Sequence, residues 1–82
     1  MPRYFIDFVD DDTKHIDTEG SFIRSIEVAR TEAVLALIQT ARDKIKVGFN
    51  QQFSASVQDE AGEELYRAWL TFEEEDFTDS KR

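Results

Sequence analysis

Residues 25–45 constrain the fold of this chain most. This is the only segment that is long enough, and free enough of glycine and proline, to form a multi-turn helix. Ser25 can act as the N-cap, since its hydroxyl can accept from the free backbone N–H groups of the first turn. Basic residues such as Lys44 come near the far end, where the helix dipole favours cations. Gly48 is a natural stop. We therefore predict one long helix.

The two faces of this helix differ. Small and apolar residues form a stripe that can cover a sheet, and it comprises Ile26, Ala29, Ala33, Ala36, Leu37 and Thr40. Val28 and Leu35 lie nearly opposite, where a monomer should carry charge. Either they are scattered exposed apolar residues, which are common on folded proteins, or they contact a second copy or a partner.

Four strands are predicted around the helix, at residues 3–9, 14–18, 53–59 and 64–72, because these segments are rich in aromatic and β-branched residues or alternate in polarity. Asp-rich and Gly-containing turns separate them. Phe22 and Ile23 should fix the helix entry against the core. The order β-β-α-β-β predicts a two-layer α+β domain over residues 1–73, with one helix packed on a mainly antiparallel sheet.

Only one face of such a sheet can lie under the helix. The buried layer should comprise Tyr4, Ile6, Phe8, Phe53, Ala55, Val57, Ala68, Leu70 and Phe72. The other face would carry Phe5, Val9, Leu65 and Trp69, with no element left to cover it. An apolar patch of this kind usually marks an interaction site. The alternative is that Arg67 and loop residues cover it.

The net charge of −8 is unevenly distributed. Residues 7–19 carry six acids against one lysine, a net of −5, and residues 73–82 carry five acids against two bases, a net of −3. The remainder is neutral. We expect residues 74–82 to be a disordered acidic tail. A chain of this charge is repelled by phosphates at long range, so we expect no nucleic-acid partner.

Chemistry-bearing residues are sparse. The chain has no cysteine and one histidine, His15, which argues against cysteine-based zinc sites, thiol catalysis and histidine-based zinc sites. Asp10 and Asp12 faintly echo a calcium loop, but Lys14 occupies a ligand position. The glycines are isolated, which excludes a glycine-rich phosphate loop. We therefore expect no catalytic residue, cofactor or metal.

The expected location is the cytoplasm. The absence of cysteine suits a reducing compartment. No apolar run approaches the length of a membrane span, and no basic-then-apolar segment of a signal peptide opens the sequence. We therefore expect no contact with a membrane.

Several motifs resemble those of one family. The opening residues 1–8, then residues 17–20, 25–34 and 57–62, resemble a group of short bacterial proteins, common in rhizobia, that begin MPRYFFD and form a domain of unknown function. The similarity covers roughly residues 1–72 and implies a small bacterial protein without an assigned activity. The chain departs from the family pattern at Ile6, Phe8, the run of aspartates after Val9, and Leu35.

The leading functional hypothesis is a non-enzymatic, homodimeric protein-interaction module. Its candidate interface residues are Phe5, Val9, Leu65, Trp69, Val28 and Leu35. One alternative is a small enzyme or divalent-metal-binding protein that uses the acidic loop 10–19. Another is a nucleic-acid-linked regulator, in which acidity would mimic or repel DNA.

Overall fold

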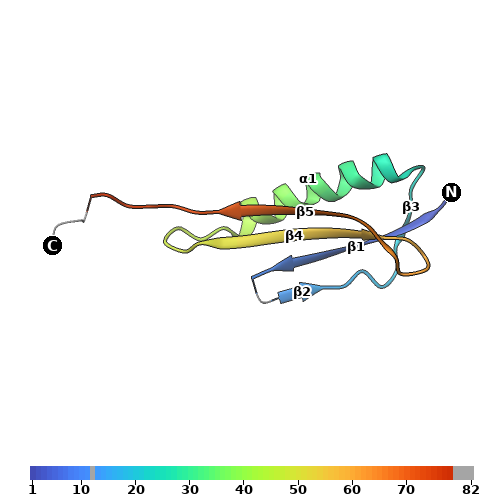
Figure 1. Ribbon diagram of the computed structural model, residues 1–82, viewed down its shortest axis with the longest axis horizontal. Helices are drawn as coiled ribbons and strands as arrows, with labels where there is room; N and C mark the ends of the chain where they lie inside the picture. Colours follow the sequence, from blue (N-terminus) through green and yellow to red (C-terminus); the bar gives the residue numbers. More distant parts are fainter. Residues whose placement is uncertain (12, 79–82) are drawn as a thin grey trace.

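The structure is a computed structural model that describes residues 1–11 and 13–78. Its elements, in chain order, are β1 (Arg3–Asp10), β2 (Thr13–His15), β3 (Ser21–Phe22), α1 (Ile26–Lys44), β4 (Gln51–Gln58) and β5 (Glu64–Phe72). Helix α1 lies on one side of the sheet, and Figure 1 shows these two layers. The predicted α+β class is confirmed, with one strand more than expected among the described residues.

The sheet is antiparallel throughout, and its main path has the order β2-β1-β4-β5. Strand β4 is therefore central and pairs with β1 on one side and β5 on the other. Strand β5 pairs with β4 along its whole length, with one irregularity at Val57/Gln58. Strand β3 pairs with the start of β1. Because β1 and β5 both run antiparallel to β4, they run parallel to each other across it.

The core lies between α1 and β4. From the helix, Ala29, Ala33, Leu37 and Ala41 are buried, at the spacing of one helical face. Below them, Phe53, Ala55 and Val57 on β4 are almost completely buried. Ile6, Phe8, Tyr66, Ala68 and Leu70 are partly buried against this cluster. The predicted buried layer is confirmed except for Phe72, which is half-buried and not part of this cluster. The strongest burial on the sheet lies on the central strand.

The predicted helix start is confirmed. Ser25 has an extended conformation, and its side-chain Oγ accepts a hydrogen bond from the N–H of Val28 at 3.2 Å. The helix ends at Lys44, and the N–H of Ile45 donates to the carbonyl of Ala41 at 2.8 Å. The chain then turns through Gly48, whose φ of 98° favours glycine.

The segment after β1 differs from the prediction. A strand was expected over residues 14–18, but β2 ends at His15, and the two-residue strand β3 follows where a turn was expected. Asp17 causes this break. Its carboxylate accepts from the N–H groups of Ile6 at 3.1 Å, Glu19 at 3.1 Å and Gly20 at 2.9 Å. A side chain thus bonds β1 where a continued strand would have used its backbone.

The charge of Asp17 is favoured by these bonds. Partial burial raises the pKa of its carboxyl, but the three backbone N–H donors outweigh it, so the pKa lies below the ordinary value of 3.8. Its own N–H donates to Oδ1 of Asp7 at 2.9 Å. Asp7 and Asp17 together attach the acidic loop to β1.

The C-terminal residues 73–78 form neither helix nor strand, and they lead away from the two layers in Figure 1. Glu74 still contacts the loop after α1, because its carboxylate accepts from the N–H of Gly48 and its N–H donates to Oδ1 of Asn50. Part of the predicted tail, residues 79–82, lies outside the described residues.

Replacing Ser25 by alanine should lower the free energy of unfolding by about 1 kcal/mol, because the first turn of α1 loses its side-chain acceptor. For a domain of this size, that corresponds to a fall in melting temperature of about 4–8 °C. Thermal unfolding followed by circular dichroism measures it. Ser21→Ala is the matched control, and an equal effect of both substitutions would contradict the assignment of the cap.

Replacing Asp17 by asparagine should lower the stability at neutral pH by about 1 kcal/mol, because an amide cannot accept all three N–H bonds. The lowered pKa means that the unfolded chain takes up the Asp17 proton first as the pH falls. The stabilisation is thus complete well above pH 3.8 and is lost below it. Urea unfolding at several pH values should show the difference between wild type and Asp17→Asn narrowing in acid, whereas Asp43→Asn should change little throughout.

Candidate functional site

The sheet face opposite α1, which we call the open face, is the first candidate site. Its centre is polar, because β4 directs Ser54 and Ser56 to this side. These serines are only 9% and 7% exposed, although no helix within the described residues covers this face. Larger side chains on β1 and β5 flank them. Small polar residues therefore form the middle of this face, between larger side chains on the two neighbouring strands.

The strand register arranges the side chains of the open face in two successive rows across the strands. In one row, Val9 on β1 and Trp69 on β5 flank Ser54. In the next, Asp7 and Arg67 flank Ser56. One row thus has apolar side chains on β1 and β5, with Lys14 of β2 next to Val9. The other has Asp7 on β1 and, on β5, Arg67 in an ion pair with Glu64 at 2.6 Å.

Hydrogen bonds hold the side chains around Ser56 in place. Ser56 Oγ donates to Glu64 Oε2 at 2.6 Å, and Arg67 Nε donates to the same oxygen at 2.6 Å. The Gln58 amide donates to Ser56 Oγ at 2.7 Å. The bond from Arg67 first, and then the bond from Ser56, hold the pKa of Glu64 below its ordinary value. A hollow of about 410 Å³ lies beside this network, next to Asp7 and Lys14.

Of the residues predicted for this face, Phe5, Val9 and Trp69 lie on it, whereas Leu65 falls at the β4–β5 register irregularity, beside residues 59–61. They also differ in exposure. Trp69 is 60% exposed and Leu65 is 42% exposed, whereas Phe5 and Val9 are half-buried. Phe5 is covered by its own chain, because a Cβ on Gly20 would come within 2.9 Å of its ring and Arg3 lies over it. Coverage by loop residues, the alternative left open by the sequence, therefore applies to Phe5 and leaves Trp69 exposed.

Phe22 corrects the expectation for the helix entry. Ile23 is buried as predicted, but Phe22 is 63% exposed. Strand β3 pairs Phe22 with Arg3, and the Arg3 guanidinium lies over both the Phe22 and Phe5 rings, at 5.5 and 5.4 Å from their centres. Phe22 therefore extends the open face instead of the core. A strand of two residues is too short to be recognised from a sequence pattern, so this pairing could not be predicted.

The second predicted surface, on the back of α1, is smaller than expected. Val28 is half-buried and packs against the core cluster. Leu35 and Ile38 are at least half-exposed. Val28 and Leu35, paired in the sequence interpretation, therefore do not form one exposed patch.

Comparison with known proteins adds the family. The model of a domain of unknown function, DUF6894, matches residues 3–71. The chain belongs to the DUF6894 family. The match runs from β1 to nearly the end of β5, so it includes α1 and both faces of the sheet. No curated protein and no solved structure matches the chain. The predicted resemblance to a domain of unknown function is confirmed.

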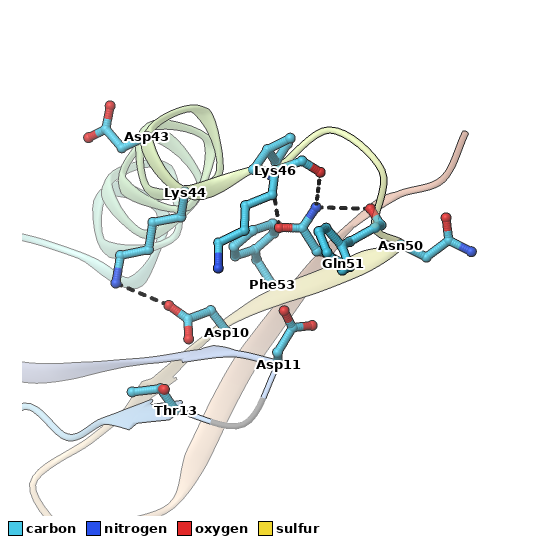
Figure 2. Close-up of a pocket in the computed structure, with 11 residues that line it drawn as sticks. Asp10, Asp11, Thr13, Asp43, Lys44, Lys46, Asn50, Gln51 and Phe53 are labelled. Carbon is cyan, nitrogen blue, oxygen red and sulfur yellow. Dashed lines mark hydrogen bonds and ion pairs between the residues drawn. The ribbon is translucent and has the colours of Figure 1, made fainter. Parts of the chain in front are cut away.

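A hollow of about 600 Å³ at the C-terminal end of α1 is the other candidate site of this DUF6894 chain. Figure 2 shows Lys44 reaching from the helix to Asp10, and their Nζ and Oδ2 atoms are 3.2 Å apart. The same Asp10 oxygen is 3.8 Å from His15 Nε2. Asp10 thus joins the end of α1 to the β1–β2 hairpin.

This arrangement bears on the alternative of a metal loop. No group of three or more histidine, cysteine, aspartate or glutamate side chains is placed to hold a metal ion within residues 1–11 and 13–78. Asp12, a member of the predicted acidic loop, lies outside the described residues.

Within the described residues, no helix is long and apolar enough to cross a membrane.

Gln51 organises the loop beside this hollow in the DUF6894 fold. Its buried side chain donates to the carbonyls of Lys46 at 2.9 Å and Phe49 at 3.0 Å, and accepts from the N–H of Lys46 at 3.1 Å. Figure 2 shows these bonds as dashed lines. The hollow is therefore shaped by a side chain that lies just before the strand predicted at residues 53–59.

Replacing Gln51 by leucine should lower the free energy of unfolding by about 1–3 kcal/mol, because backbone groups of the loop lose their partners. Chemical unfolding measures the change. Gln52→Leu is the matched control, since this neighbouring glutamine is exposed and its side-chain amide donates to the hydroxyl of Thr71. Equal losses in the two variants would show that the loop does not depend on Gln51.

Proposed function

We propose that this DUF6894 chain is a non-enzymatic protein-interaction module that forms a homodimer through the open face of its sheet. A cytoplasmic location is part of the proposal, since a chain without cysteine suits a reducing compartment. The proposal assigns the face opposite α1 to binding and the face under α1 to folding.

The exposure of Trp69 carries this proposal. Tryptophan offers a large apolar surface, and aromatic residues near the centre of an interface tend to supply much of the binding energy. Here Trp69 lies in the longest strand, in a row with Val9 and Ser54, and 60% of its surface is accessible. Leu65 and Phe22 add further exposed apolar area. Such an area is typical of a protein contact.

Three carboxyl groups, those of Asp17, Glu64 and Asp76, are held by hydrogen bonds within the fold. A general acid at neutral pH needs a raised pKa, usually from burial or a neighbouring like charge. Hydrogen bonds instead lower the pKa values of Asp17, Glu64 and Asp76. The first two bind backbone or side-chain groups of the same fold. Their role is structural in this proposal.

The back of α1 offers a weaker contact. Its exposed apolar residues, Leu35 and Ile38, are aliphatic, and Val28 is drawn toward the core. Apolar burial stabilises by roughly 25 cal/mol per Å² before the cost of association. The larger aromatic area therefore favours the open face.

The wild-type protein should be a dimer in sedimentation experiments at micromolar concentration, and Trp69→Ser should be largely monomeric because the interface loses its main apolar side chain. Leu35→Lys is the control, since it changes an equally exposed residue on the helix, and it should leave the dimer intact. A monomeric wild type would refute the proposed function. A dimer broken by Leu35→Lys alone would assign the contact to α1.

A further inference from the structure

The two rows of the open face are complementary to themselves. Because β1 and β5 run parallel on either side of β4, Asp7 lies level with Arg67, and Val9 lies level with Trp69. Each row has a side chain on β1 and a chemically complementary one on β5, with a serine between them. Lys14 of β2 also lies beside Val9, and Glu64 is bonded to Arg67. If a second copy faces the first with β1 opposite β5, Asp7 therefore meets Arg67 and Val9 meets Trp69.

We infer that two copies pack open face to open face around a two-fold axis that runs parallel to β4 between the two sheets. This inference rests on the proposed homodimer and specifies its geometry. Rotation about such an axis reverses the order of the strands across the sheet but keeps each residue at the same height along the strand direction. It places β1 of one copy opposite β5 of the other and β4 opposite β4, as in an aligned sandwich of two sheets.

In this arrangement, Asp7 of each copy faces Arg67 of the other. Both side chains also keep partners within their own chain: Asp7 Oδ1 accepts from the N–H of Asp17, and Arg67 uses Nε for Glu64. A guanidinium has several further N–H donors, so Arg67 can bond Glu64 and the second copy's Asp7 together. Two such pairs form per dimer, and both charges have partners in the interface.

Trp69 of each copy faces Val9 of the other and lies above Ser54. The small serine leaves room for an indole between the sheets, which pack about 10 Å apart. An axis perpendicular to the strands and centred on the Ser56 row would instead place Asp7 opposite Asp7 and Arg67 opposite Arg67. Like charges at close range oppose association, so the axis parallel to β4 is favoured.

The size of the face sets the expected affinity. In this arrangement β1, β4 and β5 face strands of the second copy, and three strand positions over the length of β4 give a flat area of roughly 14 by 26 Å, or about 370 Å² per copy. Typical stable interfaces bury roughly 800 Å² per partner. The contact is thus smaller than a typical stable interface, and we expect the dimer to dissociate on dilution below micromolar concentration.

The experiment uses two full-length variants with opposite changes, Arg67→Glu and Asp7→Lys. Each alone should weaken its homodimer about tenfold or more, because both pairs become like-charged. Mixed together, they should form a heterodimer of near wild-type affinity, since one pair stays native and the other is restored with its charges reversed. Sedimentation equilibrium of each variant and of the mixture measures this, with circular dichroism as the check of folding. Asp43→Lys, on the helix, should dimerise like wild type.

Each outcome decides between the two proposals. A monomeric wild type overturns the proposed function and the pairing together. A wild-type dimer whose variants dissociate no more readily, or whose mixture does not recover, overturns the pairing and leaves another dimer surface. If Asp7→Lys does not fold, Asp7→Asn replaces it, because its amide oxygen can still accept from Asp17. Mixing it with Arg67→Glu should then give tighter association than Arg67→Glu alone, and no gain would refute the pairing.

Discussion

The contact between α1 and β4 is the interaction on which the rest of this structure depends. Alanines at 29, 33 and 41 have little side-chain volume, so the helix backbone can approach the sheet closely. Phe53 and Val57 fill the space below and are the largest side chains that are fully buried. A chain with one helix can cover one sheet face in this way, and the polarity of β4 on its other face follows from that limit.

The sequence predicted the parts of the fold that depend on repeating patterns. The helix, its Ser25 cap, the strand at 64–72 and the alternation that buries Phe53, Ala55 and Val57 all follow from periodicity or from known preferences at helix ends. Each pattern involves several residues that favour the same element, and the tertiary contacts of the helix and strands are consistent with them. The candidate residues Phe5, Val9, Leu65 and Trp69 were likewise assigned to a face by alternation.

The features that sequence could not predict depend on single side chains that bind distant backbone. Asp17 ends β2 by accepting from Ile6, eleven residues away, and nothing in its neighbourhood distinguishes it from the other aspartates of the loop. Gln51 shapes the loop after α1 through bonds that require its exact burial. Phe22 and Phe5 depend on the close approach of Gly20 and Arg3. Periodicity describes which face a residue occupies, whereas these contacts decide how exposed it remains.

The open face shows how two small residues, Ser54 and Ser56, affect the character of a surface. Had β4 carried large apolar residues at positions 54 and 56, the face would be a flat hydrophobic surface with little specificity in its contacts. Instead, the serines lie between Val9 and Trp69 in one row and between Asp7 and Arg67 in the next. The side chains on β1 and β5 differ in chemistry, and such a face distinguishes one orientation of a partner from another. The polar centre makes the face less hydrophobic, and under the proposed homodimer it would also make binding selective, because a second copy has the complementary order of side chains.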